Sequence, residues 1–307
     1  MDWKLKTLLV ILNVIQPTRK VELSGIKEER KKNSKVAELG KFLFDKKETV
    51  FSVTDSKIEY IPIRIYKNSK LPEQKVIIYF HGGGFCFYNI DSHDFVCRRL
   101  CKMNNSTVIS VDYRLAPEYV FPSAQEDAFK AVEYIYKHAK GFGINRNKIV
   151  VAGDSAGGTL SACVAHHFKN RKDIKIAGQI LIYPWIDGRV NSESIEKCKE
   201  GYMLTKEAIL RFQSVYTPNV EDRLNPLAAP THNDDFSNLP PAFIATAEFD
   251  PLKDEGTEYA EKMKKARNKV ICNDYKGLIH GFANIPLIAP NGMDLYKDIQ
   301  KFLEDNI

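Results

Sequence analysis

The segment Ile149-Val-Val-Ala-Gly-Asp-Ser-Ala-Gly-Gly158 decides how this chain folds. Its first four residues are continuously apolar, which is typical of a strand covered on both faces. Gly-Asp-Ser-Ala-Gly follows over 153–157 and fits the Gly-x-Ser-x-Gly pattern of a tight strand-to-helix turn. Such a turn lifts the Ser155 side chain above the sheet, at a helix N-terminus that favours developing negative charge. Ser155 is therefore the candidate nucleophile, with Asp154 beside it in the motif.

Short apolar runs recur on both sides of this segment and predict further strands. They are Val50 to Thr54, Ile58 to Tyr66, Val76 to Phe80, Thr107 to Val111, Gln179 to Tyr183, Ala242 to Thr246 and Val270 to Cys272. Helices are predicted between most of them, over about 92–103, 123–139, 157–170 and 252–267, and after the last strand over about 293–305. This alternation indicates an α/β fold with a mostly parallel central sheet flanked by helices.

Two regions fall outside the alternation of strands and helices. Residues 1 to about 47 are rich in Lys, Glu and Leu, and residues about 187–235 contain helix-like pieces such as 205–216 but no strong strand. We expect both regions to form a helical cap over the carboxyl ends of the strands, where open α/β sheets bind ligands. With 44% hydrophobic and 27% charged residues, the 307-residue chain is predicted to be one globular domain, 1–307.

Charge and composition exclude several classes of partner. The net charge of +6 is spread along the chain, and the densest basic run also holds Glu28 and Glu29, so no nucleic-acid partner is predicted. The apolar run 7–12 is too short to span a bilayer and lacks a cleavage site, which favours a helix packed on the protein over stable membrane insertion. The six cysteines form no Cys-x-x-Cys pair and no zinc-type spacing, so we predict free thiols, no metal and a cytoplasmic location.

A glycine-rich motif, His81-Gly82-Gly83-Gly84-Phe85, directly follows the predicted strand that ends at Phe80. A carbonyl under nucleophilic attack becomes an oxyanion, whose hydrogen-bond donors must lie about 3 Å away. Backbone N–H groups can approach that closely where no side chain blocks them, as in a run of glycines. The N–H of Ala156 is the expected remaining donor. His81 precedes the glycines, and we expect it to brace the loop by hydrogen bonding rather than to act as a base.

The general base should follow the nucleophile and the acid in the order of the chain. Four histidines follow Ser155. His166 and His167 lie within the predicted helix after the turn, and His232 lies in the irregular region before any acid borne by the sheet. His280 lies in a loop after the last apolar run and is therefore the predicted general base and acid. We expect activity to fall on acidification, when this imidazole becomes protonated.

The acid should lie in the loop after the strand that precedes His280. Asp250, Asp254 and Glu255 all occur there. Pro251 favours a helix starting at that point, which places Asp254 and Glu255 in its first turns and leaves Asp250 at the cap. Asp250 is the predicted acid, with simple N-capping as the alternative. It would hold the tautomer of His280 and stabilise the imidazolium that forms.

Together these motifs resemble those of the hormone-sensitive-lipase-like carboxylesterases, the bacterial family IV of the α/β-hydrolases. The resemblance covers about residues 50–305 and rests on His81-Gly-Gly-Gly-Phe85, Asp112-Tyr-Arg-Leu-Ala-Pro-Glu118, Phe121-Pro122, Glu126-Asp127, Gly153-Asp-Ser-Ala-Gly-Gly158, Asp250-Pro-Leu-Lys-Asp-Glu255 and His280-Gly-Phe282. It implies the α/β-hydrolase fold with a cap and hydrolysis of esters with short to medium acyl chains. It also implies that Gly83, Gly84 and Ala156 donate to the oxyanion. Lys253 stands where family members often carry Arg.

The predicted reaction is a two-step acyl transfer to and from Ser155 that needs no cofactor. A small-molecule ester is the expected substrate, although the same machinery suits an amide, a formamide or an acetylated sugar. An enzyme acting at a lipid surface is a further alternative, suggested by the apolar run 7–12. A ligand receptor is disfavoured, because plant hormone receptors of the resembled family have lost the histidine that this chain keeps at 280. A homodimer is compatible with the sequence, which leaves the oligomeric state open.

Two further groups of residues have a structural and a functional interpretation. Arg114 and its acidic neighbours are expected to form an ion network that supports the site rather than to contact the substrate. Phe85, Trp185 and Phe212 are candidates for the lining of a substrate pocket, although aromatic residues at such positions more often belong to the core.

Overall fold

The computed structural model describes residues 25, 26, 28–30, 48–285, 289 and 291–307. One eight-stranded sheet runs through it in the order β1-β2-β4-β3-β5-β6-β7-β8. The strands are β1 Ser52–Ile58, β2 Ile61–Lys67, β3 Gln74–Phe80, β4 Thr107–Val111, β5 Ile144–Asp154, β6 Gly178–Ile182, β7 Ala242–Phe249 and β8 Val270–Ile279. The pairs β1–β2 and β2–β4 are antiparallel and every other pair is parallel, which confirms the predicted mostly parallel sheet.

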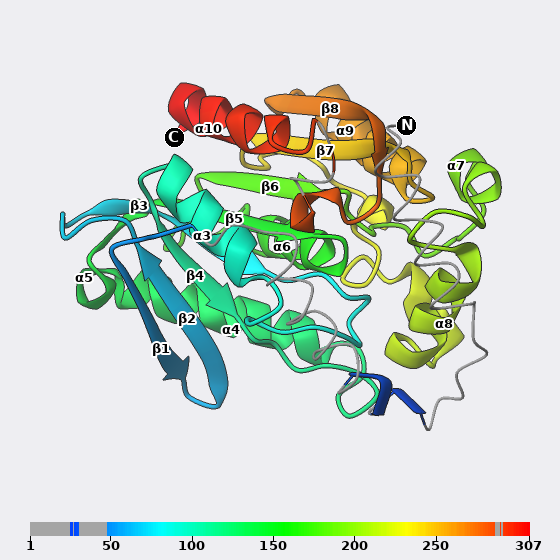
Figure 1. Ribbon diagram of the computed structural model, residues 1–307, viewed down its shortest axis with the longest axis horizontal. Helices are drawn as coiled ribbons and strands as arrows, with labels where there is room; N and C mark the ends of the chain where they lie inside the picture. The colour runs from blue at the N-terminus through cyan, green and yellow to red at the C-terminus, as the bar shows by residue number, and fades with distance from the viewer. Residues whose placement is uncertain (1–24, 27, 31–47, 286–288, 290) are drawn as a thin grey trace.

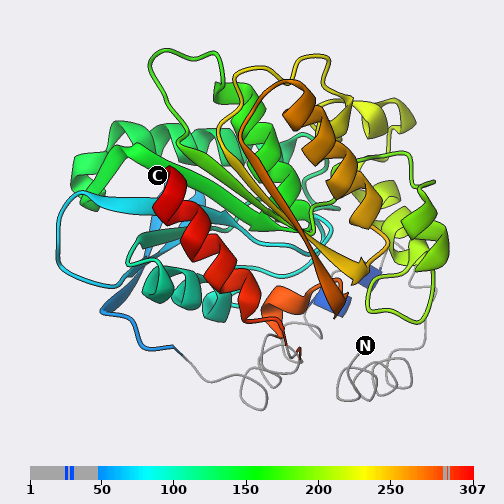
Figure 2. The ribbon, with the colours of Figure 1, turned by 90° about the horizontal axis from the view of Figure 1, so that it is seen from above.

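Helices cover both faces of this sheet (Figures 1 and 2). Those between and after the strands are α3 Asp94–Met103, α4 Ser123–Lys137, α5 Ala139–Phe142, α6 Ala156–Phe168, α9 Lys253–Lys265 and α10 Asp294–Asn306. On one face, α3 and α10 pack together with Ile77 and Tyr79 of β3. On the other face, α4 and α6 pack with Ile78 and Phe80 of the same strand. Successive side chains of a strand point to opposite faces, so burial of both faces explains the continuous apolar runs in the sequence.

Several element boundaries differ from the sequence prediction, and two of the differences involve a turn that the sequence did not indicate. The predicted strand from Ile58 to Tyr66 is interrupted by a turn, because β1 ends at Ile58 and β2 begins at Ile61. Glu59 in that turn has a φ of 53°, and Ile58 pairs with Ile61 across it. Both isoleucines are buried, so the apolar pattern continues through the turn and conceals it. The predicted helix 123–139 ends as α4 at Lys137, and the short α5 follows after His138.

The region between β6 and β7 forms two helices and two short 3-10 turns. They are α7 Glu193–Lys197, α8 Lys206–Tyr216, and the turns Val220–Leu224 and Pro230–His232. Figure 1 shows α7 and α8 together at one side of the sheet. Thr205 caps α8 by accepting a hydrogen bond from the Ala208 N–H at 3.1 Å, which satisfies one of the free donors of its first turn. We call the range 187–235 the inserted segment.

Most of the predicted N-terminal helical region, 1 to about 47, lies outside the described residues. Of the part that is described, Ile26 is fully buried and belongs to the same core as α4 and α6. Glu29 forms an ion pair of 2.8 Å with Arg211 of α8. In the described parts of the chain, no helix combines the length and the apolar character needed to cross a bilayer.

Candidate active site

The turn between β5 and α6 holds Ser155 in a conformation that side-chain-bearing residues rarely adopt. Its φ is 53° and its ψ is −119°. The turn is pressed against the end of β3, since a Cβ on Gly157 would lie 1.9 Å from the carbonyl oxygen of Phe80. Glycine is therefore required there for space, and the close packing holds the strained serine in place. Ser155 lies at the N-terminus of the buried helix α6 and is 8% exposed.

His280 and Asp250 complete a chain of hydrogen bonds with this serine. His280 Nε2 lies 3.0 Å from Ser155 Oγ, and His280 Nδ1 lies 2.8 Å from Asp250 Oδ2. Asp250 is fully buried and follows β7, while His280 follows β8. A carboxylate that accepts from Nδ1–H leaves Nε2 as the acceptor for the serine hydroxyl. The structure thus brings together the three residues that the sequence singled out, in a geometry suited to proton abstraction from Ser155.

The acidic neighbours of Asp250 point elsewhere. Asp254 Oδ2 accepts a hydrogen bond of 2.7 Å from the Ser194 N–H, and Glu255 Oε1 accepts one of 2.7 Å from the Ile186 N–H. The helix predicted to start at Pro251 begins two residues later, at Lys253, and its N-cap is Leu252. Asp250 Oδ1 accepts a hydrogen bond from the Leu252 N–H at 2.8 Å, a contact of the N-cap type that also holds the carboxylate in position.

The other histidines after Ser155 have structural surroundings. His166 lies between the rings of Phe236 and Tyr259, at 5.1 and 6.1 Å, and His167 stacks on Phe129 at 4.0 Å. His232 Nε2 lies 3.0 Å from Asp187 Oδ1.

The glycine loop after β3 has the backbone form that its sequence requires. Gly83 has a φ of 114° and Gly84 a φ of 59°. The N–H groups of Cys86 and Phe87 both donate to the Gly83 carbonyl, at 3.0 and 2.9 Å. A Cβ on Gly83 would lie 2.2 Å from the Phe87 carbonyl oxygen, so a larger residue would open this turn. Ala156 is the first residue of α6, where a backbone N–H has no partner within the helix.

His81 lies beneath this loop, fully buried. Its Nδ1 is 2.7 Å from the Gly82 carbonyl oxygen, its ring stacks on Tyr113 at 4.4 Å, and the Tyr113 hydroxyl donates to the His81 carbonyl at 2.6 Å. Burial, and then the nearby His93, lower the pKa of His81 to about 3. The imidazole is therefore neutral at neutral pH, and its position is that of a support for the loop backbone. Its Nε2 lies 3.8 Å from a carboxylate oxygen of Asp112.

Side chains of the inserted segment reach two sides of this site. The ring of Phe212 from α8 lies so close to Gly84 that a Cβ there would approach it to 2.6 Å. Phe212 also meets Phe87 edge-on at 5.8 Å. On the other side, the sulfur of Met203 lies 3.3 Å from the position of a Cβ on Gly281, next to the histidine of the triad. Nothing in the sequence around Met203 indicates this placement.

The other two aromatic candidates belong to the core. Phe85 is 1% exposed and stacks on Tyr216 at 3.8 Å, and Trp185 is 8% exposed and lies 6.0 Å from Phe85. Phe212 is partly buried and is the one of the three that lies against the glycine loop.

The expected ion network around Arg114 is present. Its guanidinium lies 2.8 Å from Asp127 and 3.1 Å from Glu126. Asp127 is fully buried and also accepts a hydrogen bond of 2.8 Å from the Tyr60 hydroxyl. The network ties the chain after β4 to the start of α4, and so supports the site without lining it.

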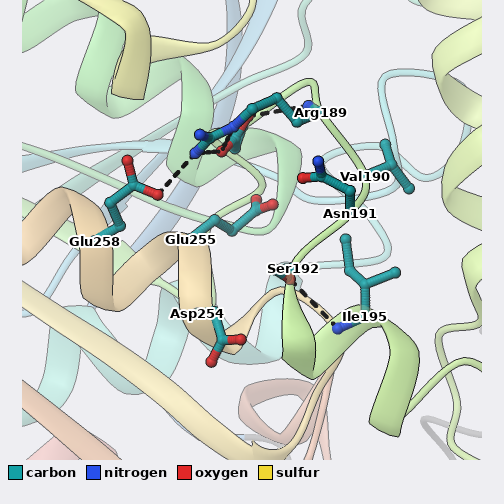
Figure 3. A pocket seen from close by; sticks show the side chains of 9 residues that line it. Arg189, Val190, Asn191, Ser192, Ile195, Asp254, Glu255 and Glu258 are labelled. Atoms are coloured by element: carbon teal, nitrogen blue, oxygen red, sulfur yellow. Dashed lines mark hydrogen bonds and ion pairs between the residues drawn. The ribbon is translucent and has the colours of Figure 1, made fainter.

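A cavity of about 200 Å³ lies between α9 and the loop after β6 (Figure 3). It is lined by Asp187, Arg189, Val190, Asn191, Ser192, Ile195, Asp254, Glu255 and Glu258, so the triad lies outside it. Arg189 pairs there with Asp187 and, at 2.7 Å, with Glu258. Burial, and then the charge of Asp187, raise the pKa of Glu255 well above its ordinary range. Across the part of the chain that the structure describes, no group of three or more His, Cys, Asp or Glu side chains is placed to hold a metal ion.

Comparison with known proteins places this chain in a family. A profile of the α/β-hydrolase fold matches residues 77–284. The esterase LipI of Mycobacterium tuberculosis is 37% identical over 235 residues, which are 75% of this chain and 73% of that protein. An arylesterase of Saccharolobus solfataricus is 35% identical over 78% of this chain and 80% of its own length. The crystal structure of an esterase from Pyrobaculum calidifontis superposes with a TM-score of 0.92 at 33% identity, covering 99% of this chain and 98% of that one.

Proposed function

This chain belongs to the α/β-hydrolase fold family and is a carboxylesterase, and we propose that Ser155, His280 and Asp250 are its catalytic triad. One observation carries the proposal: the hydrogen-bonded chain of 3.0 and 2.8 Å that links Ser155 Oγ through the imidazole to the Asp250 carboxylate. A serine hydroxyl is a weak nucleophile until a neighbouring base takes its proton, and this chain supplies the base.

The reaction proceeds in two steps, the acylation and then the deacylation of Ser155. His280 takes the proton of Ser155 as its oxygen attacks the ester carbonyl, and the carbonyl electrons move onto the oxygen. When the tetrahedral intermediate collapses, the bond to the alcohol breaks and His280 returns the proton to the leaving alcohol. Water then attacks the acyl-enzyme with the same proton transfers, which releases the carboxylic acid and restores Ser155. Asp250 stays ionised throughout and stabilises the imidazolium.

The oxyanion donors in this proposal are the N–H groups of Gly83, Gly84 and Ala156. Their support is the loop geometry, in which two consecutive residues with positive φ lie beside the turn that carries Ser155. The α6 N-terminus adds a partial positive charge at the same place. His81 and Gly82 hold the loop rather than contact the substrate.

For the substrate, we propose esters with short to medium acyl chains. The ring of Phe212 supports this, because it lies against the proposed oxyanion loop and leaves little space beside Gly84. A relative from Pseudomonas putida, 32% identical over 72% of this chain, is an ethyl acetate hydrolase. The cap that shapes this space would be formed by about 1–47 and about 187–235 on a single domain, 1–307. The Glu29–Arg211 ion pair supports contact between its two parts.

A series of p-nitrophenyl esters from acetate to dodecanoate tests the proposal, assayed with the wild type and Ser155→Ala. We expect the highest kcat/KM at four to six carbons and a loss of at least about 10⁴-fold in kcat for Ser155→Ala. Circular dichroism of the variant would show that it is folded. Wild-type rates in Ser155→Ala would contradict the triad, and an optimum above ten carbons would contradict the acyl-chain preference.

The proposal extends to location and assembly. A cytoplasmic location is supported by six free cysteines, five of them buried thiols that a reducing compartment would keep reduced. A homodimer is supported by β8, which ends the sheet and pairs on one side with β7. Light scattering after size exclusion would measure the mass directly, and a mass of 35.0 kDa would contradict the dimer.

A further inference from the structure

The buried carboxylate of Asp154, the residue before the nucleophile, contacts four other segments of the chain. It is 3% exposed. Its Oδ1 accepts hydrogen bonds from the Tyr79 hydroxyl of β3 at 2.7 Å and from the Gly82 N–H of the glycine loop at 2.9 Å. His93 Nε2, at the start of α3, lies 3.2 Å from the same oxygen. Asn284 Nδ2, in the turn after β8, lies 3.4 Å from Oδ2.

These contacts join the three segments that carry the proposed chemistry. Asp154 is bonded in sequence to Ser155, Gly82 precedes the proposed oxyanion donors, and Asn284 lies in the short turn that follows His280. The functional groups of all three segments lie in turns or loops. The backbone of a loop keeps its position to within about 0.5 Å where packing or hydrogen bonds hold it. Asp154 is an anchor common to all three.

The contact between Asp154 and the glycine loop is direct and leaves no space for a side chain. A Cβ on Gly82 would lie 2.5 Å from Asp154 Oδ2. The loop backbone is therefore seated against the carboxylate itself.

The carboxylate is charged in this buried place. Burial opposes its ionisation, but the charge of His93 and the hydrogen bonds from His93 and Tyr79 outweigh burial and lower the pKa of Asp154 to about 2. An ionised carboxylate can only accept hydrogen bonds, which matches the donors that surround it. A hydrogen bond from a backbone N–H to a charged group is stronger than one to a neutral group.

We propose that Asp154 is a positioning residue that fixes the oxyanion loop relative to Ser155 through its hydrogen bond with the Gly82 N–H. It does not touch the reacting atoms, and the proposal rests on the triad and the oxyanion donors proposed above. Oxyanion donors act on the charge that develops in the transition state and less on the bound ester. A loop that loses its anchor therefore lowers kcat and the affinity for transition-state analogues, and leaves KM nearly unchanged.

Asp154→Asn tests this with a side chain of the same shape but without the charge. We expect kcat to fall by about 10- to 100-fold with KM within about threefold, since a misplacement of about 1 Å costs on the order of 100-fold in rate. The affinity for an alkyl trifluoromethyl ketone, which forms a tetrahedral adduct with an active serine, should fall by the same factor as kcat.

Asp127→Asn is the matched control. Asp127 is an equally buried carboxylate with several donors, but it belongs to the Arg114 network and not to the loop. We expect it to lower Tm while kcat stays within about twofold of wild type. If Asp154→Asn lowers Tm in the same way and leaves kcat and ketone affinity unchanged, Asp154 has only a structural role and the proposal is wrong.

A double-mutant cycle with Gly82→Ala tests the contact from the side of the loop. The added methyl would displace the loop from Asp154, so Gly82→Ala should also lower kcat, and it provides the test should Asp154→Asn fail to fold. The double variant should lose no more activity than the worse single variant, because both changes weaken the same contact. Additive losses would overturn the proposal. Wild-type kcat in Asp154→Asn, with an inactive Ser155→Ala, would overturn it as well and leave the triad standing.

Discussion

The sheet and the inserted segment between β6 and β7 are held together in different ways. Strands β4 and β6 are buried along their whole length, and their side chains pack against helices on both faces. The inserted segment consists of the short α7, α8 and two 3-10 turns. It carries half of the large apolar side chains that are exposed in the described chain, namely Met203, Leu210, Val220, Leu224 and Leu227. Side-chain packing therefore constrains the positions of the sheet strands more strongly than the position of the inserted segment.

The proposed site divides along the same line. The triad comes from the ends of β5, β7 and β8, where neighbouring strands determine each position. Phe212 and Met203, which approach the site from outside, come from the inserted segment. We therefore expect the chemistry to depend on the sheet and the choice of substrate to depend on the inserted segment. Four measurements test whether the sheet and the inserted segment differ in this way.

The largest effect is expected from Asp250→Asn, which tests whether the chemistry depends on the sheet alone. We expect kcat/KM to fall by about 10³- to 10⁴-fold, because asparagine would hold His280 in the wrong tautomer. Asp254→Asn, in the first turn of α9, is the matched control, since Asp254 accepts from the Ser194 N–H of the segment instead. Its kcat/KM should stay within about threefold. Steady-state rates on p-nitrophenyl butyrate measure both, and equal losses would mean that the acid is misassigned.

The next effect concerns the rigidity of the sheet. A methyl group on Gly157 would lie 1.9 Å from the Phe80 carbonyl oxygen, with no flexible side chain to move away. We expect Gly157→Ala to lower the free energy of unfolding by about 3 kcal/mol. Gly141→Ala is the control, because a Cβ there meets nothing within 4 Å. Urea denaturation of both variants would refute the comparison if they were equally stable.

A smaller effect is expected from Phe212→Ala, which tests whether the segment controls the substrate. Removing the ring should open space beside Gly84 and raise the ratio of kcat/KM for octanoate to butyrate by about tenfold. Leu210→Ala, on the same helix but with its side chain 45% exposed, should leave that ratio unchanged. A shift of equal size in both variants would show that the helix acts through its stability rather than through this ring.

The smallest effect concerns Glu255 of α9, which accepts a hydrogen bond from the Ile186 N–H, immediately before the inserted segment. Its pKa is raised in the folded protein by burial and by Asp187, so the contribution of Glu255 to stability falls as pH rises above 4.5, the ordinary value in the unfolded chain. Glutamine keeps the neutral form and the hydrogen bond. Glu255→Gln should therefore match the wild type near pH 4.5 and exceed its stability by about 1 kcal/mol at pH 8.

Thermal melts at both pH values provide the measurement for Glu255. A variant that is less stable than the wild type by the same amount at pH 4.5 and pH 8 would show that the carboxyl group is needed for packing rather than held neutral at a cost.

Local patterns predicted most strands of the sheet and supplied the candidates for the proposed triad. Central strands such as β3 and β6 contain continuous apolar runs. Gly-Asp-Ser-Ala-Gly, placed between such a run and a helix-like segment, indicates a turn at Ser155. The order of serine, acid and histidine then left Asp250 and His280 as candidates. The same logic failed at Glu59, because the buried Ile58 and Ile61 extend the apolar pattern across a turn. It also failed at Pro251, which allows a helix start but does not require one.

The sequence alone was enough to predict the α/β architecture, the turn at the proposed nucleophile and the candidate residues around it. These features depend on short-range periodicity and backbone sterics. Only the tertiary structure decided that Asp154 meets Tyr79, His93 and Asn284, and that Phe212 lies against the glycine loop. Such contacts join positions far apart along the chain, and no local sequence pattern around either residue indicates its partner. They follow from how the strands and helices pack, which becomes known once the fold is complete.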